Sequence, residues 1–288
     1  MVRILCIAGP TASGKSNRAV EEALKQNGEI ISVDSRQVYR GLDIGTEKIT
    51  KEEMRGVPHH LIDIRNPNEN YSAGDFVKDA KRLIKEVSAR GKLPILVGGT
   101  HFYFHALLYG LPMGIDANPA LRAELERLPT IRLFARIREQ DPRRAGELDP
   151  KNRRRLIRAL EIIDSLGAVP PRSRVEVRHP QLLWMSDFHK EWVIIDPPRE
   201  KLRARIDARL KNALERGLVE EVRRVREAVG LSDQGDARLN ELGLEYKIVG
   251  EFLRGERDEV SLLPALSAKL WQYARRQKAW LRKLQNAP

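Results

Sequence analysis

A glycine-rich segment near the start of the 288-residue chain has the spacing of a phosphate-binding loop. It fits the pattern G-x-x-x-x-G-K-[ST] and consists of Gly9, Pro10, Thr11, Ala12, Ser13, Gly14, Lys15 and Ser16. In such a loop, backbone N–H groups converge on phosphate oxygens, the lysine reaches the outer phosphates, and the hydroxyl suits Mg²⁺. A chance match in a turn is the alternative, but an apolar run precedes the motif and helical spacing follows it. The motif alone does not say whether the ligand is ATP or another phosphorylated molecule.

Two further polar positions follow predicted strands. Asp34 and its neighbours Ser35, Arg36 and Gln37 come directly after the apolar run 29–33, and Thr100 follows the run 93–97 and two glycines. Ligands of doubly wound sheets bind at the carboxyl ends of the strands, so Asp34 and Thr100 are expected near the phosphate loop. A helix-capping role explains either residue type equally well.

The first 110 residues alternate between strand and helix patterns, which predicts a parallel sheet covered on both faces. The predicted strands are 3–8, 29–33, 60–64 and 93–97, and the predicted helices are 15–26, 72–89 and 101–109. Adjacent His59 and His60 would point to opposite sides of a strand, so we interpret them as structural residues and not as metal ligands.

The pattern changes after a segment rich in Pro and Gly at 111–119. Helices are predicted at 120–128, 131–140 and 152–166, a strand at 191–195, and helices at 201–213, 218–229 and 264–284. We therefore expect an α/β fold with a core like that of the P-loop NTPases, a parallel sheet with flanking helices, formed by residues 1–112 and 186–288. Residues 113–185 are expected to form a small helical insertion domain.

Composition narrows the class of protein. The chain is 41% hydrophobic and 32% charged, and its apolar runs are far shorter than the roughly 20 residues of a membrane span. The first residues form a strand pattern and not a signal-peptide layout, so a cytoplasmic protein is expected. The single cysteine, Cys6, excludes an internal disulfide or a zinc cluster.

The charge distribution favours a polyanionic partner. The net charge is +12, and two blocks, 151–158 with five basic residues and 269–283 with six, contain no acidic residue. A basic surface that only confers solubility is the alternative, but uniform scatter of charge rarely leaves two such blocks. Nucleic acid is the expected partner.

An ordered set of motifs makes the chain resemble one family from end to end, the tRNA dimethylallyltransferases, also called isopentenyl-tRNA transferases. The phosphate loop is shared with many families, whereas the set as a whole is specific, above all the segment 34–46. The matching segments are 9–16, 34–46, 59–63, 71–76, 96–100, 155–161, 205–209, 217–222 and 275–280.

The resemblance implies a bacterial-type, Mg²⁺-dependent and monomeric enzyme with Ser16 on the metal. Such an enzyme transfers the dimethylallyl group from dimethylallyl diphosphate to the exocyclic N6 amine of adenosine 37, beside the tRNA anticodon, and releases diphosphate. Thr11, Lys15 and Arg209 match residues that handle the diphosphate. Asp34 matches the residue that takes the proton from the amine, and Thr100 matches one that lines the channel into which the adenosine flips.

The resemblance also implies tRNA contacts. Asp34, Ser35, Arg36, Gln37 and Thr100 are expected to contact tRNA in the channel. In the insertion domain the expected contacts are Arg122, Arg154, Arg155 and Arg158, and in the last helix they are Arg275, Arg276, Gln277, Trp280 and Arg282. Tyr273 shares a helix face with Gln277 and Trp280 but is expected to pack in the core. Lys278 and Arg282, on another face, are expected to meet phosphates.

Some positions depart from the family pattern. His101 replaces a common glycine and either narrows the channel mouth or only starts a helix, Ala279 replaces the usual threonine, and the order of residues 243–247 differs. Two other functions stay open: a P-loop kinase or NTPase acting on a nucleoside or small metabolite, and a non-catalytic nucleic-acid-binding module.

Overall fold

The computed structural model describes residues 2–110, 118–170 and 188–285. The chain divides into two compact units, Met1–Gly110 with Leu182–Pro288, and Leu111–Gln181. The boundaries expected at residues 113 and 185 lie outside the described residues. Each unit is described here by itself.

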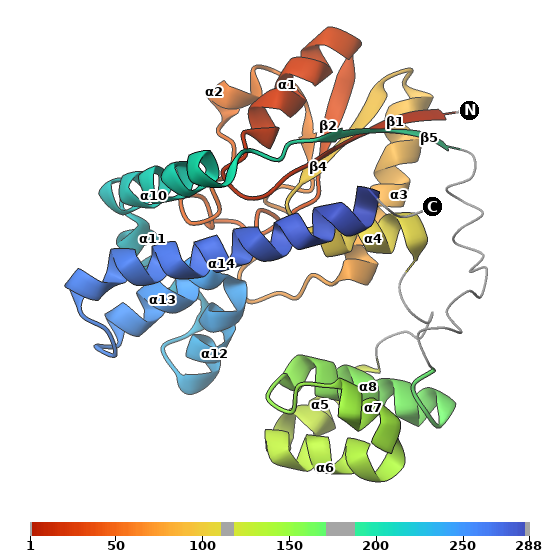
Figure 1. The fold of residues 1–288 in the computed structure, drawn as a ribbon, viewed down its shortest axis with the longest axis vertical. Coiled ribbons are helices and arrows are strands. Elements are labelled where there is room, and N and C mark those ends of the chain that lie inside the picture. The colour runs from red at the N-terminus through yellow and green to blue at the C-terminus, as the bar shows by residue number, and fades with distance from the viewer. Residues whose placement is uncertain (1, 111–117, 171–187, 286–288) are drawn as a thin grey trace. The chain divides into compact units, whose positions relative to one another are not determined.

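The larger unit is built on a five-stranded sheet in which every pairing is parallel, as predicted (Figure 1). The strands are β1 (Val2–Ala8), β2 (Gly28–Ser32), β3 (His59–His60), β4 (Leu93–Gly98) and β5 (Phe188–Ile194), in the order β3-β2-β4-β1-β5. The strand predicted at 60–64 exists as β3 but covers only residues 59–60, because Leu61 and Asp63 have positive φ angles of 62° and 56° that end the extended backbone.

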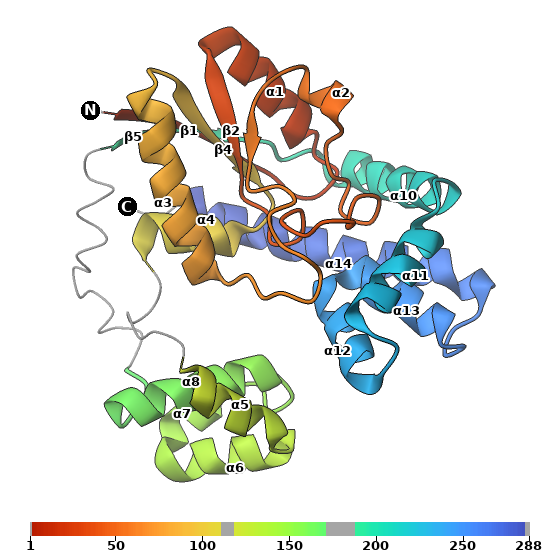
Figure 2. The ribbon, with the colours of Figure 1, turned by 180° about the vertical axis from the view of Figure 1, so that it is seen from behind.

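Helices cover both faces of this sheet (Figure 2). Helix α1 (Lys15–Gln26) packs Ala19, Val20 and Ala23 against Leu5 and Ile7 of β1. Side chains alternate along a strand, so Ile4 and Cys6 face the opposite side, where α3 (Ala73–Ala89) contacts β2 and β4. The short α2 (Lys51–Met54) lies between β2 and β3 in the chain, and α4 (His101–Tyr109) follows β4.

The C-terminal part of the larger unit is helical (Figure 1). Its helices are α10 (Arg199–Glu215), α11 (Leu218–Val229), α12 (Asp233–Leu242), α13 (Leu244–Leu253) and α14 (Glu259–Gln285). Its last helix, α14, packs against α13, α10 and α4. Helix α14 begins five residues before the predicted start at Pro264, because the Asp258 carboxylate accepts the Ser261 N–H at 2.8 Å near its N-terminus.

Two helices in this region, α12 and α13, were not predicted. Gly235 lies within α12, Gly250 lies within α13, and Gly243 separates the two helices, so glycines interrupt the apolar pattern. A side chain at Gly235 would lie 1.7 Å from the Gly230 carbonyl oxygen, so close packing requires this glycine.

The smaller unit consists, in its described residues, of α5 (Pro119–Arg127), α6 (Thr130–Gln140), α7 (Pro142–Glu147) and α8 (Arg153–Leu166). These helices share an apolar core that includes Leu125, Leu133, Ile137, Leu156 and Leu160. Helix α7 was not predicted. It begins with Pro142 after Asp141, whose carboxylate accepts the Arg144 N–H at 2.9 Å. Within the described part of the chain, no helix has the length and hydropathy needed to cross a membrane.

Candidate active site

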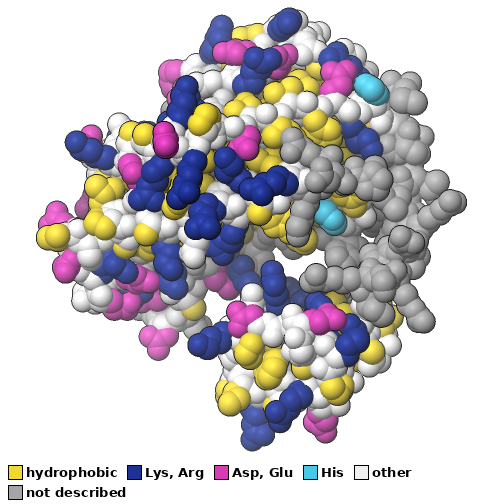
Figure 3. Space-filling model, viewed as in Figure 1, with side chains coloured by type: hydrophobic (Ala, Val, Ile, Leu, Met, Phe, Trp, Pro, Cys, Tyr) yellow, Lys and Arg dark blue, Asp and Glu magenta, His cyan; other side chains and the backbone are white. Residues whose placement is uncertain are grey.

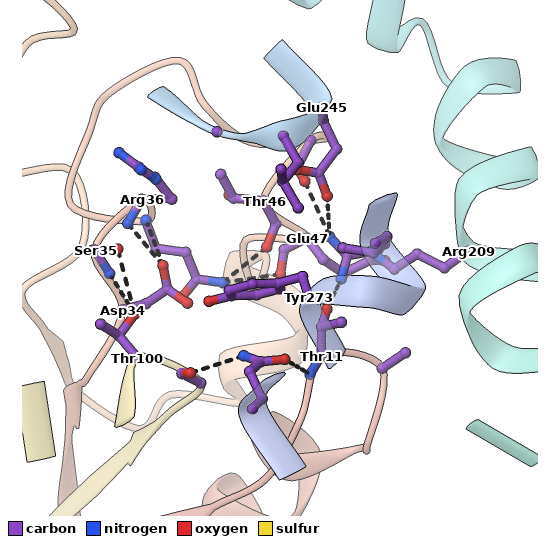
Figure 4. A pocket seen from close by; sticks show the side chains of 18 of the residues that line it. Thr11, Asp34, Ser35, Arg36, Thr46, Glu47, Thr100, Arg209, Glu245 and Tyr273 are labelled. Carbon is purple, nitrogen blue, oxygen red and sulfur yellow. Dashed lines mark hydrogen bonds and ion pairs between the residues drawn. The ribbon is translucent and has the colours of Figure 1, made fainter. Parts of the chain in front are cut away.

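A cavity of about 940 Å³ opens where β1, β2 and β4 end. It is lined by the phosphate loop, the segments that follow β2 and β4, and residues of α10, α13 and α14 (Figure 4). All of these elements belong to the larger unit. The sequence prediction that Asp34 and Thr100 share one crevice with the phosphate loop is confirmed.

The phosphate loop joins β1 to α1, as the strand and helix patterns around the motif predict. Ala12 and Gly14 have positive φ angles of 59° and 89°. Gly9 has no room for a side chain, because a Cβ atom there would lie 2.7 Å from the Ile195 carbonyl oxygen. The loop therefore runs close to the end of β5 and lies beside the positive end of α1, where backbone as well as side chains can face an anion.

Lys15 is held inside the cavity. Its Nζ lies 3.4 Å from the Pro10 carbonyl oxygen. Burial lowers the pKa of Lys15 to about 8, with the Asp34 charge opposing this shift and the Arg209 charge adding to it. The lysine is therefore a poorly solvated cation that an arriving phosphate would stabilise.

The last helix is tied to the phosphate loop through Gln277, which is only 4% exposed. Its Oε1 accepts the backbone N–H of Thr11 at 2.9 Å, and its Nε2 donates to the Gly99 carbonyl at 2.8 Å. A second link comes from α10, where Arg205 donates to the Ser13 carbonyl at 3.2 Å. Gln277, expected to contact tRNA, thus has both ends of its amide bonded to the protein.

Arg209 reaches the loop from α10 (Figure 4). It donates to the Thr11 hydroxyl and, at 3.0 Å, to the Gly45 carbonyl. Its guanidinium also forms ion pairs with Glu47 at 2.8 Å and with Glu245 at 3.6 Å. The structure thus brings the predicted diphosphate residues Thr11 and Arg209 into direct contact.

Asp34 uses one carboxylate oxygen to shape its own turn. Oδ1 accepts the N–H groups of Arg36 at 2.8 Å and Gln37 at 3.2 Å, an Asx turn in place of a helix cap. The other oxygen makes no hydrogen bond with any described residue, and Asp34 lines the cavity. One oxygen thus fixes the side chain and the other is available to a ligand.

The neighbours of Asp34 differ in their roles. Thr100 accepts the Ser35 N–H at 3.1 Å, which joins the ends of β2 and β4. Gln37 donates to the carbonyls of Thr46 at 3.3 Å and Glu47 at 3.2 Å. Ser35, Arg36, Gln37 and Thr100 all line the cavity. The amide nitrogen of Gln37, however, already donates hydrogen bonds to the protein backbone.

Helix α14 contributes one wall of the cavity, formed by Leu270, Tyr273, Arg276, Gln277 and Trp280. The expectation that Tyr273 packs in the core was wrong, because its ring lines the cavity. In the view of Figure 4 it lies between Asp34 and Arg209. The position is favourable for stacking against a flat ligand.

The other faces of α14 carry basic side chains. Lys278 is paired with Asp196 at 2.8 Å and also donates to the Pro197 carbonyl. Arg275, Arg276 and Arg282 are exposed. Figure 3 shows Lys and Arg side chains gathered over α10 and α14 on one face of the larger unit.

Sequence reasoning missed the two carboxylates beside Arg209. Glu245 belongs to the segment 243–247, whose order departs from the family pattern, and that departure was the available signal. Burial raises the pKa of Glu245, while the Arg209 charge opposes the rise. Glu47 follows the segment 34–46 directly.

His101 begins α4, as one of its two expected roles requires, and it also lines the cavity. It is 3% exposed, and its Nε2 has no hydrogen-bond partner among the described residues. Burial, followed by the charge of Lys15, lowers the pKa of His101 to about 4, so the ring is neutral at pH 7.

Metal ligands are sparse in the described residues, where no group of three or more His, Cys, Asp or Glu is placed to hold an ion. Ser16 lines the cavity, and its hydroxyl makes no hydrogen bond with a described residue. His59 bonds the Val57 carbonyl, and His60 bonds buried Glu29 at 2.7 Å, which agrees with structural roles.

The predicted tRNA contacts of the smaller unit lie in α5 and α8. Arg122 makes two hydrogen bonds, at 3.0 and 2.8 Å, to Glu161, which is 1% exposed, and Arg158 donates to the same carboxylate at 3.2 Å. Arg154 and Arg155 are exposed on α8. Arg122 therefore pairs with a buried carboxylate of its own unit and stabilises the packing of α5 against α8.

Known proteins match nearly the whole chain. A family model described as "IPP transferase" matches residues 37–284. A tRNA dimethylallyltransferase of Thermomicrobium roseum is 41% identical, with 98% of this chain and 84% of the relative covered. A tRNA dimethylallyltransferase of Oceanobacillus iheyensis is 38% identical, and the match covers 98% of this chain and 89% of that relative.

Two solved structures extend the match. The tRNA isopentenylpyrophosphate transferase of Bacillus halodurans is 36% identical, with a TM-score of 0.69 and coverage of 98% of this chain and 87% of that one. A eukaryotic dimethylallyltransferase acting on tRNA is 29% identical, with a TM-score of 0.79 and coverage of 98% and 70%. The family model thus matches most of the chain, and relatives about 40% identical match nearly all of it. This chain therefore belongs to the IPP transferase family.

Proposed function

We propose that this protein transfers the dimethylallyl group from dimethylallyl diphosphate to the N6 amine of adenosine 37 in tRNA, beside the anticodon. The bond between the allylic carbon and the diphosphate oxygen breaks, a bond from that carbon to N6 forms, and diphosphate leaves with the electron pair. The observation that carries the proposal is that Asp34 and the group of Thr11, Lys15 and Arg209 line one cavity.

The cationic side of the cavity suits the leaving group. Negative charge develops on the diphosphate as the allylic bond breaks, and preorganised donors stabilise it most where water is excluded. The loop N–H groups, Lys15 and Arg209 are such donors. Burial disfavours the charged form of Lys15 and lowers its pKa to about 8, so an arriving anion stabilises that charge.

Asp34 is proposed as the general base. The lone pair of an adenine amine is delocalised into the ring, so the amine becomes a good nucleophile only as its proton is removed. The Asp34 oxygen without a described hydrogen-bond partner is suited to accept that proton, while its Asx turn holds the carboxylate in place. Tyr273 offers a ring face to the adenine.

Mg²⁺ is part of the proposal. Ser16 and the diphosphate oxygens would hold the ion, because Mg²⁺ at phosphate sites usually takes only one or two protein ligands and completes its coordination with phosphate oxygens and water. Bound there, the ion would neutralise charge on the leaving group. The absence of an acidic cluster among the described residues fits a site completed by the substrate.

The tRNA is proposed to approach from the side of Asp34, with its adenosine flipped into the cavity. Basic residues of α8 and α14 would contact phosphates, which position the substrate without reading its sequence. In keeping with the resemblance to the tRNA dimethylallyltransferases, the active species is further proposed to be a monomer in the cytoplasm.

The proposal is tested by incubating the protein with Mg²⁺, radiolabelled dimethylallyl diphosphate and unmodified tRNA. The expected result is label in tRNA that depends on adenosine 37, with no ATP requirement. A P-loop kinase or NTPase would instead turn over ATP and leave tRNA unlabelled. A non-catalytic nucleic-acid-binding module would bind tRNA and do neither.

A further inference from the structure

The motif 217–222 has no role in the chemistry described so far, yet it carries a buried charge. Glu221 of α11 is only 2% exposed. Its Oε2 accepts the backbone N–H groups of Asp43 at 2.9 Å and Ile44 at 2.7 Å. Its Oε1 accepts the Gly45 N–H at 2.9 Å and the Tyr246 hydroxyl at 2.7 Å.

Four hydrogen bonds to one carboxylate offset the free-energy cost of burying its charge. Three of them are consecutive backbone N–H groups, and such N–H groups point at a single anion only when the backbone is held in a particular turn. The Lys48 N–H closes the same turn on the Asp43 carbonyl at 2.9 Å. Glu221 therefore fixes the conformation of the turn 43–47.

This turn supplies acceptors to two cavity residues. The Gly45 carbonyl accepts from Arg209 at 3.0 Å, and the Thr46 and Glu47 carbonyls accept from Gln37. The turn is also packed tightly, because a Cβ atom at Gly45 would lie 2.9 Å from the Tyr246 hydroxyl oxygen. A continuous series of contacts thus runs from Glu221 through Gly45 to Arg209 and Thr11.

We propose that Glu221 is a positioning residue for diphosphate binding, which acts by fixing the Gly45 carbonyl that holds the Arg209 guanidinium against the phosphate loop. The proposal rests on the proposed function, in which Arg209 binds the diphosphate. Glu221 itself lies outside the residues that line the cavity.

The test uses inorganic diphosphate with Mg²⁺ as the probe and calorimetric binding as the readout, so that it does not depend on turnover. Glu221→Gln places an amide NH₂ against at least one backbone N–H in either orientation of the side chain. The expected result is at least about tenfold weaker diphosphate binding and an equal rise in KM for dimethylallyl diphosphate, with KM for tRNA unchanged. The matched control is Glu220→Gln, since Glu220 is an exposed neighbour that forms an ion pair with exposed Arg223.

A second background separates positioning from general loss of structure. If Glu221 acts through Arg209, Glu221→Gln weakens diphosphate binding tenfold in the wild type and by less than twofold when Arg209 is already alanine. Equal losses in both backgrounds would overturn the proposal, as would a lower unfolding temperature with unchanged diphosphate affinity.

Milder changes cover the case in which Glu221→Gln does not fold. Tyr246→Phe removes one donor to Glu221 and keeps the three backbone N–H groups. Gly45→Ala adds a Cβ atom that would clash with the Tyr246 side chain and so displace the same turn. Both are expected to weaken diphosphate binding, and unchanged binding in both would overturn the proposal. Wild-type protein that binds no diphosphate would contradict the proposed function itself, which is a distinct result.

Discussion

The side-chain carbonyl of Gln277 accepts the Thr11 N–H at 2.9 Å, so α14 is hydrogen-bonded to the phosphate loop. The amide nitrogen of the same side chain holds the Gly99 carbonyl after β4. One buried amide therefore joins three elements that meet at the cavity.

Changing Gln277 to Glu is expected to damage diphosphate binding more than stability. The substitution keeps an acceptor for Thr11 but removes the donor to Gly99 and places negative charge beside the diphosphate site. We expect KM for dimethylallyl diphosphate to rise at least about tenfold. Steady-state kinetics check this, with Gln272→Glu on an exposed position of the same helix as the control. Equal KM values for the two variants would contradict the role assigned to Gln277.

The Asp34→Asn variant tests the proton acceptor without disturbing the turn. The amide oxygen of asparagine can still accept the Arg36 and Gln37 N–H groups, but the side chain cannot take a proton. Single-turnover transfer is expected to slow by about 10²- to 10⁴-fold, with tRNA affinity kept. Asp34→Ala, which also loses the turn, should in addition weaken tRNA binding. Wild-type transfer by the asparagine variant would exclude Asp34 as the base.

Diphosphate affinity is expected to depend on pH through Lys15. Below pH 8 the lysine is mostly charged in the free protein, so binding requires no proton uptake. A bound anion raises the pKa of Lys15, so above pH 8 binding takes up a proton and affinity falls by up to about tenfold per pH unit. His101 stays neutral throughout this range.

Calorimetry in buffers of different ionisation enthalpy measures the proton uptake directly. Lys15→Arg is the control, because arginine stays charged at every pH in this range and its affinity should not fall in that way. Identical pH profiles for the two proteins would assign the dependence to the ligand and not to Lys15.

Two arginines of the smaller unit are expected to behave differently. Arg155 is exposed and has no ion-pair partner among the described residues, so Arg155→Ala should reduce the salt dependence of tRNA binding by slightly under one unit of slope. Arg122→Ala removes two hydrogen bonds to buried Glu161 and should instead lower the unfolding temperature. Binding titrations over a salt series, together with thermal unfolding, separate the two effects. A reduced slope for Arg122→Ala at an unchanged unfolding temperature would make Arg122 a tRNA contact as well.

Local signals in the sequence predicted local structure well. Helix α1 was predicted with its observed bounds, because Gly14 ends the loop with a left-handed backbone and the apolar spacing begins at once. The crevice shared by Asp34 and Thr100 followed from the rule that parallel strands end at the same edge.

Contacts between distant segments were beyond such signals. Glu221 and Gly45 are 176 residues apart in the chain, and the contact depends on the packing of α11, which periodicity alone does not locate. Tyr273 was misassigned for a related reason, since the wall of a cavity and the core of a domain give the same apolar pattern on a helix. For the carboxylates beside Arg209, the only signal was the unusual order of residues 243–247, which includes Glu245 but does not place it against Arg209.

The position of α14 in the chain has a consequence for biosynthesis. Translation proceeds from the N-terminus at about 5–20 residues per second, and strands β1 to β4, the phosphate loop and Asp34 are all made before residue 100. The residues of α14 that complete the cavity wall, including Gln277, which accepts the Thr11 N–H, are made more than 150 residues later. A nascent chain that has reached residue 250 therefore displays a phosphate loop without this hydrogen bond, and the ability to process a prenyl diphosphate arises only after α14 has been made.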